Sequence, residues 1–157
     1  MKDDMDIKIK KDIYVSLAFS LYGHLIGLDK SLKEIKAKSM GFVVNPEGEF
    51  FLIAPKDLSF NTIDLTRNVL FTIIKEGRSV VDMSEIQVEG KANLVQEEDL
   101  KEKIRSLFLE KSPYFSSIPF MDDPSNFVFV HLIPSRIKFQ NLQEEREGKD
   151  PYFLEKI

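Results

Sequence analysis

The chain has 157 residues, a formal net charge of −4 and no cysteine. This length suits one domain with a sizeable core and is too short for two. The charge provides no general basic surface, so we expect no nucleic-acid partner. The absence of cysteine excludes disulfides, thiolate metal sites and cysteine nucleophiles, and it fits the reducing cytoplasm, where we expect the protein to act.

The beginning of the chain changes from charged to apolar. Residues 1–11 are predicted to be a flexible N-terminus because most of them are charged. Residues 13–28 contain no Asp, Glu, Lys or Arg and resemble an export signal in length. However, Asp3, Asp4 and Asp6 disturb the positive start of such a signal, and the apolar run is too short to span a bilayer. We therefore expect no membrane association, and the period-two alternation within this run predicts a buried strand.

The middle of the chain predicts strands joined by short connections. Residues 29–36 are a polar connection or a short helix, and residues 36–55 predict two strands around the turn "NPEG". Asp57 or Ser59 is a suitable N-cap for a short helix that precedes the next predicted strand, "VLFTIIKE".

A long strand follows in "SEIQVEGKANLV", with apolar residues on one face and polar residues on the other. Gly90 occupies an apolar position in this alternation, which predicts a bulge, a bend or a close backbone approach. The strand leads into a helix whose first residues, 97–99, are acidic. Its apolar face is predicted to comprise Leu100, Ile104, Leu107 and Phe108.

The last predicted strand covers residues 127–142, where Pro134 indicates an edge or a bend. Together the elements predict an α+β fold: a six-stranded antiparallel β-barrel with two or three short helices. The barrel domain is expected to span residues 12–142. Residues 143–157 are expected to be a C-terminal tail, either frayed or docked through its apolar residues Tyr152, Phe153, Leu154 and Ile157.

Three segments, taken in order, resemble the pyridoxamine 5′-phosphate oxidase-like superfamily of FMN-binding split barrels. They are "GEFFLIAPKDLSFNTIDLTRNVLFTIIKEG", "SEIQVEGKANLVQEEDLKEKIRSLFLEKSPYF" and "FVFVHLIPSRIKFQNL". The resemblance covers roughly residues 12–142. It implies a split barrel, a homodimer with FMN bound at the subunit interface, and an oxidoreductase that acts on a small molecule.

The resemblance also implies where FMN binds. In the family the phosphate is held by a serine or threonine and a basic residue at the start of the short helix, with a further threonine shortly before them. Here Ser59 keeps the serine, Ala54 replaces the threonine, and Asn61 replaces the basic residue. Because a phosphate dianion needs positive charge, lysines of the preceding strand are expected to supply it. The cofactor-binding residues implied in this way are Lys36, Lys38, Ala54, Pro55, Ser59, Asn61, Thr62 and Gln87, with Gln87 contacting the flavin ring.

Several of these residues also have purely structural interpretations. Ser59 is equally suitable as a helix cap, and Lys36 and Lys38 suit the solvated face of an edge strand. The two histidines, His24 and His131, are too few to predict a metal site.

No nucleophile–base pair is visible in the sequence, so catalytic residues are not assigned. Two functions therefore stay open. One is a flavoprotein, and the other is a cofactor-free split barrel with a binding or structural role, its phosphate site lost through Ala54 and Asn61.

Overall fold

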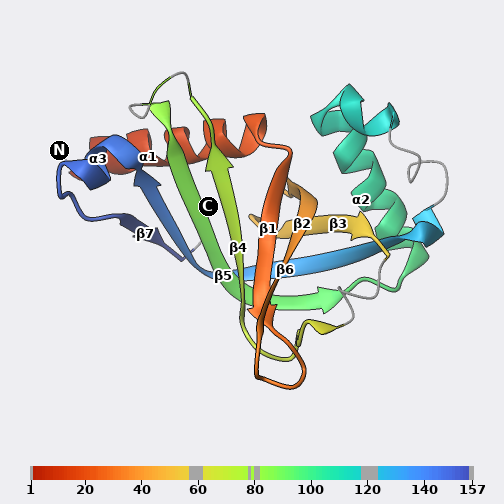
Figure 1. Cartoon of the computed structure of the whole chain (residues 1–157). Helices are drawn as coiled ribbons and strands as arrows, with labels where there is room; N and C mark the ends of the chain where they lie inside the picture. Colours follow the sequence, from red (N-terminus) through yellow and green to blue (C-terminus); the bar gives the residue numbers. More distant parts are fainter. Residues whose placement is uncertain (1, 57–61, 78, 80–81, 118–123, 156–157) are drawn as a thin grey trace.

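The computed structural model describes residues 2–56, 62–77, 79, 82–117 and 124–155 (Figure 1). These residues form seven strands, three α-helices and two short 3-10 helices. The strands are β1 (Tyr22–Leu28), β2 (Ile35–Val44), β3 (Phe50–Pro55), β4 (Val69–Lys75), β5 (Ser84–Leu94), β6 (Phe127–Asn141) and β7 (Tyr152–Leu154). The helices are α1 (Lys2–Phe19), α2 (Glu98–Lys111), η3 (Pro113–Ser117), η5 (Pro124–Asn126) and α3 (Leu142–Arg146).

The strands form one antiparallel sheet that closes on itself. Their order is β3-β2-β1-β4-β5-β6-β7, and β3 also pairs with β6. This additional pairing joins the two ends of the six-stranded part, while β7 stays outside the ring. The predicted α+β barrel with six antiparallel strands is therefore confirmed.

Two apolar clusters hold the elements together. The first fills the barrel and contains fully buried side chains such as Leu25, Phe42 and Phe71. The second lies on the outside of the barrel, where Ile104 and Phe108 of α2 pack with Phe115 of η3. This second cluster rests on the outer side chains of β2, β3 and β6, namely Val43, Phe51, Ile53 and Phe129. One part of the outer barrel surface is thus covered by helix, as the right side of Figure 1 shows.

Gly90 lies where β5 and β6 change register. The pairing shifts between Glu89 and Gly90, and a Cβ atom at Gly90 would meet the backbone carbonyl group of Ile133. The predicted bulge with a close backbone approach is confirmed.

We expect Gly90→Ala to lower the free energy of unfolding by about 1–3 kcal/mol, because β5 or β6 must move to admit the methyl group. Urea unfolding at one fixed chain concentration measures this change. Lys91→Ala is the matched control, since Lys91 is exposed on the same strand and should change stability by less than about 0.5 kcal/mol. Equal unfolding free energies for the two variants would contradict the close approach.

Pro134 lies within β6 without ending it. β6 pairs with β3 up to Leu132 and with β7 from Ile137, so the stretch between them has only β5 as a neighbour. A proline has no N–H to donate, and it is tolerated where one edge of the strand is unpaired. The predicted edge position is confirmed, and the strand continues through it.

The first helix corrects the sequence prediction. Residues 2–19 form α1, so the strand predicted over residues 13–28 is wrong in its first part and correct only for β1. The predicted boundary between residues 11 and 12 lies inside this helix. Ile9, Ile13 and Leu17 recur every four residues and are buried in the barrel core, and this packing outweighs the local alternation. No described helix is long and apolar enough to cross a membrane.

The C-terminal segment docks on the barrel. β7 pairs with the second half of β6, and Tyr152 and Leu154 pack against the core. Phe153 lies under the guanidinium group of Arg136, 4.0 Å from ring centroid to Cζ. The docked alternative for this segment is confirmed for these residues, while Ile157 lies outside the described residues.

Lys111 connects the end of α2 to β2 through contacts with Phe42. Its Nζ donates a 2.9 Å hydrogen bond to the backbone oxygen of Phe42 and lies 3.6 Å from the centroid of the Phe42 ring. The ring and the carbonyl oxygen favour the ammonium form. Burial outweighs both and lowers the pKa of Lys111 to about 7.

This pKa makes stability depend on pH. Between about 7 and the ordinary lysine value of 10.5, the unfolded chain binds more protons at Lys111 than the folded chain does. Stability should therefore rise with pH across this window, and Lys111→Met should remove that part of the slope. Chemical denaturation of both chains over a pH series checks this. Identical slopes would show that the amine is not buried.

Candidate functional site

One part of the outer barrel surface carries no helix in the described residues. Figure 1 shows β1, β4 and β5 side by side in front of the barrel, with α2 on a different side. Side chains directly opposite each other on neighbouring strands share a face. Ile26 pairs with Leu70 and Leu70 with Glu89, while Thr72 pairs with Gln87. We call this surface of β1, β4 and β5, together with the first part of β2, where Ile35 pairs with Leu28 and Ala37 with Ile26, the open face.

Several large apolar side chains of the open face are exposed. Ile35 is 74% exposed and Ile74 54% exposed, and Leu28, the register partner of Ile35, is 37% exposed. A folded chain rarely leaves such side chains grouped in water unless another molecule covers them.

The open face contains a pocket of about 430 Å³ that opens to solvent. This volume lies in the range of small-molecule sites, roughly 300–1,000 Å³. Most of its lining is apolar, with two amides and one carboxylate as its polar groups. The lining residues are Ile26, Gly27, Leu28, Ile35, Asn68, Val69, Leu70, Gln87 and Glu89. We call this space the outer pocket.

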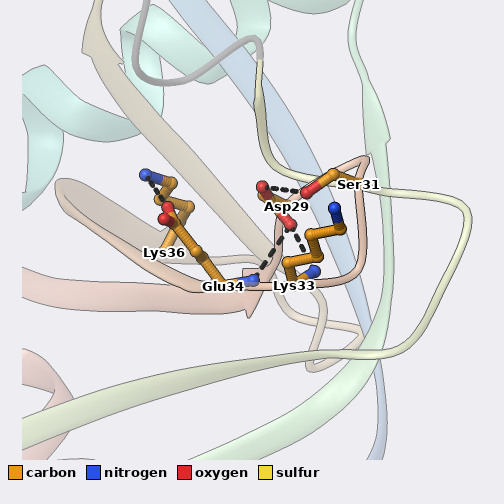
Figure 2. A network of polar contacts seen from close by, with 5 residues as sticks. All are labelled: Asp29, Ser31, Lys33, Glu34 and Lys36. Carbon is orange, nitrogen blue, oxygen red and sulfur yellow. Dashed lines mark hydrogen bonds and ion pairs between the residues drawn. The ribbon is translucent and has the colours of Figure 1, made fainter.

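The turn between β1 and β2 forms one rim of the outer pocket and is held by Asp29 (Figure 2). The Asp29 carboxylate accepts hydrogen bonds from the Ser31 hydroxyl at 2.6 Å and from the backbone N–H groups of Lys33 and Glu34. These hydrogen bonds, that from Ser31 foremost, lower the pKa of Asp29. The turn contains no helix, and Leu32 adopts a positive φ of 61° within it.

A second turn, before β4, forms the neighbouring rim. Asp64 accepts hydrogen bonds from the hydroxyl and the backbone N–H of Thr66, which lower its pKa. The two turns are joined by backbone hydrogen bonds of 2.8 Å, from Lys30 N–H to Thr62 oxygen and from Asp64 N–H to Leu28 oxygen. The rim is therefore held in place by hydrogen bonds before any ligand arrives.

Gln87, which the resemblance places against the flavin ring, lines the outer pocket, and its contact with a ligand stays a prediction. It lies on the open face of β5, is half-buried, and its Nε2 donates a 2.9 Å hydrogen bond to Glu85. This bond orients the amide along the strand.

Lys36 and Lys38 lie on β2, next to the pocket but outside its lining. Lys36 pairs in register with Gly27, a pocket residue, and directly follows Ile35, another pocket residue. Its Nζ lies 2.8 Å from the Glu34 carboxylate, and this hydrogen bond raises the pKa of Lys36. A Cβ atom at Gly27 would meet the buried residues Ile63 and Val69, and Lys38 pairs with the buried Leu25. Both lysine side chains therefore lie on the face of β2 opposite to Ile35 and the outer pocket.

The remaining predicted site residues are not brought into the pocket. Ala54 is 2% exposed and faces the barrel core, and Pro55 is exposed at the end of β3. Thr62 is exposed on the rim, where its backbone oxygen accepts from Lys30. Ser59 and Asn61 lie outside the described residues.

The histidines lie on different surfaces. His24 is exposed on the open face, opposite Thr72. His131 stacks on Phe51 with ring centroids 4.7 Å apart, and its Nε2 lies 3.0 Å from Glu49. Among the described residues no group of three or more His, Asp or Glu side chains is placed to hold a metal ion.

Comparison with family models and with curated protein sequences gives no match. Solved structures do match. They include the heme binding protein from Mycobacterium smegmatis, with a TM-score of 0.68 and 13% identity over 92% of this chain and 56% of that chain. ChuZ from Campylobacter jejuni gives a TM-score of 0.72 and 14% identity over 94% of this chain and 59% of that chain.

A third match is a protein from Listeria innocua named after pyridoxamine 5′-phosphate oxidase. It gives a TM-score of 0.61 and 19% identity over 84% of this chain and 98% of that chain. The chain has the pyridoxamine 5′-phosphate oxidase-like split-barrel fold. At identities this low, structural similarity shows the fold alone. The ligand has to be argued from the residues of this chain.

Within this split barrel, sequence reasoning missed most of the pocket lining. Ile26, Leu70 and Glu89 come from three strands and meet only through the strand register. One signal was present in the predicted strand "VLFTIIKE". Leu70 and Ile74 lie on one face of this strand and Phe71 and Ile73 on the other, so both of its faces carry apolar side chains. A strand that is apolar on both faces indicates that its outer face is also covered.

Proposed function

We propose that this chain is a homodimeric FMN-binding split barrel that binds the flavin in the outer pocket and acts as an oxidoreductase on a small molecule. The observation that carries the proposal is the open face itself. It exposes large apolar side chains, no helix covers it in the described residues, and it holds a preformed pocket with apolar and amide groups. The identity of the cofactor rests on the resemblance to FMN-binding split barrels.

The pocket suits the ring of a flavin. Ile26, Leu28 and Leu70 offer apolar surface to a flat aromatic system. Gln87 supplies amide donor and acceptor groups of the kind that pair with the polar edge of such a ring. FMN supplies the redox chemistry when bound, and these residues bind the ring, orient it and exclude water from one of its faces.

The phosphate of FMN needs a cation that the pocket lining lacks. Glu89 is the charged residue of the lining, and an acidic side chain cannot supply the positive charge that a phosphate needs. The resemblance assigns this charge to Lys36 and Lys38 of β2, whose side chains lie on the other face of that strand, so the phosphate would have to reach around the strand to meet them. The resemblance places Ser59, Asn61 and Thr62 beside the same phosphate.

A second copy of the chain completes the site. The exposed side chains of Leu28 and Ile35 line the outer pocket, so a partner seated there would cover them and the pocket together. A two-fold dimer buries the same patch on both subunits, so one such face on each chain is enough to form the interface.

The direct test of the function is the absorption spectrum of the purified protein, followed by titration with FMN. A flavin band in the purified protein, or saturable quenching of FMN fluorescence on titration, supports the proposal. A colourless protein that leaves FMN fluorescence unchanged supports the cofactor-free alternative.

We expect the double variant Lys36→Ala with Lys38→Ala to weaken FMN binding about fivefold or more, because the resemblance makes these lysines the source of positive charge for the phosphate. Riboflavin has no phosphate, so its affinity should stay the same. Fluorescence titration of both ligands gives the two dissociation constants. Equal weakening of both ligands would place the phosphate elsewhere.

We expect Ile35→Glu to convert the dimer to a monomer at micromolar concentration, because a carboxylate on the open face would be buried without a partner in the dimer. Sedimentation velocity measures the change. Ile7→Glu is the matched control, since Ile7 is 66% exposed on α1, away from the open face. A wild-type chain that sediments as a monomer contradicts the dimer.

One observation favours heme as a second candidate ligand. His24 is exposed on the open face, two residues before Ile26 of the pocket, and an imidazole is a common ligand of heme iron. Two of the matching structures are proteins whose names or functions concern heme, the Mycobacterium smegmatis protein and the HutZ heme storage protein of Vibrio cholerae. A Soret band after addition of hemin, lost in His24→Ala, would favour heme over FMN.

A further inference from the structure

We infer that Arg136 and Lys138 of β6 form an anion-binding site beside the open face, which holds a phosphate or carboxylate group of a small molecule bound in the outer pocket. This inference rests on the proposed function and deepens it, because it states the charge that such a molecule carries. The two side chains border the outer pocket and are not part of its lining.

The strand register puts both cations on the same side of the sheet as the outer pocket. Arg136 lies directly opposite Glu89, which lines the pocket. Lys138 lies directly opposite Gln87, which also lines it. Ile137, between the two cations, is fully buried in the barrel core, so both of its neighbours point outward. Directly opposite side chains have Cβ atoms roughly 5 Å apart, so each cation starts one strand away from the pocket lining.

Phe153 of β7 orients the guanidinium group of Arg136. β7 pairs with β6 on the side away from β5, and Phe153 lies directly opposite Lys138. The Cζ atom of Arg136 lies 4.0 Å from the centroid of the Phe153 ring. A guanidinium group stacked on a ring keeps its N–H edge free for a planar, bidentate contact with a carboxylate or a phosphate. Arg136 is exposed and Lys138 half-buried, so a ligand can reach both from solvent.

Neither cation has an acidic partner among the described residues. No ion pair or side-chain hydrogen bond in that part of the chain engages Arg136 or Lys138. Glu89 is opposite Arg136 in the register, yet the guanidinium group stacks on Phe153 instead. Glu85, the next acid on this side of β5, accepts a hydrogen bond within its own strand. Two unpaired cations on one strand repel each other, and an anion bound between them removes that repulsion.

The anionic group can belong to either of two molecules. The strand order β2-β1-β4-β5-β6 puts β6 on the other side of the pocket from β2, where the resemblance places the phosphate of FMN. With the phosphate at β2, the cations of β6 hold the anionic group of the substrate. With the flavin reversed in the pocket, they hold the phosphate itself. The chemistry is the same in both cases, and two titrations distinguish the sources.

The test uses two pairs of ligands that differ in charge. FMN and riboflavin are titrated with the chain and followed by fluorescence. Benzoate and its neutral analogue benzamide are titrated into the FMN-loaded chain and followed by the flavin absorption band. We expect Arg136→Gln with Lys138→Gln to weaken the charged member of one pair about fivefold or more and to leave its neutral member unchanged. A loss for FMN identifies the cofactor phosphate as the anion, and a loss for benzoate identifies the substrate.

Two further variants serve as controls. Lys8→Gln with Lys10→Gln removes the same two charges from exposed positions of α1 and should change the affinity for none of the four ligands. Lys138→Gln alone keeps the stack of Arg136 on Phe153 and should still weaken the affected ligand about twofold. If the α1 variant has as large an effect as the β6 variant, the effect is one of net charge and the anion site is wrong.

The remaining outcomes separate the anion site from the proposed function. If FMN binds and the β6 variant weakens neither FMN nor benzoate more than their neutral analogues, the anion site is wrong while the pocket stands. If the β6 variant sediments as a monomer and the wild-type chain as a dimer, the cations hold the partner subunit, and the anion site is also wrong. If the wild-type chain binds neither flavin, the proposed function fails, and the anion site fails with it.

Discussion

The closing pairing between β3 and β6 is the constraint on which the rest of the molecule depends. β6 is long enough to pair with three other strands. Its first half pairs with β3, its second half pairs with β7, and β5 pairs along nearly all of it. Closure removes the exposed edges that a six-stranded sheet would otherwise present. The register shift at Gly90 and the unpaired edge at Pro134 occur where β6 changes partner, and they let one strand bend around the barrel.

This closure also decides where a ligand can bind. The barrel interior is filled by side chains such as Phe42 and Phe71, so it has no room for a cofactor. Outside, α2 and η3 cover β2, β3 and the first half of β6. The open face of β1, β4 and β5 is what this arrangement leaves, and the turns of Asp29 and Asp64 border it with a rim joined by hydrogen bonds.

The sequence predicted those parts of the molecule that depend on local pattern. The strand containing Gly90 and the helix with Ile104 and Phe108 have clear periodicities, and the structure confirms both. α1 was missed because residues 13–21 alternate with a period of two, whereas the burial of Ile9, Ile13 and Leu17 follows from packing on the barrel. Local pattern carries no information about that contact.

The candidate site depends on distant pairs, so less of it could be predicted. Gln87 was found through its position in the resembling segment. Ile26 and Leu70 could not be found, because their contact requires the register between β1 and β4.

The central claim is that the open face is the functional surface, covered by a second copy and by the ligand. The chain has no cysteine, so a single introduced cysteine reports on one position. Ala37→Cys places a thiol on this face, opposite Ile26, and Glu110→Cys places one on exposed α2. The account predicts that maleimide modifies Ala37→Cys much more slowly than Glu110→Cys at dimer-forming concentration, and more slowly still with FMN. Equal rates at the two positions, unchanged by dilution or by FMN, would contradict it.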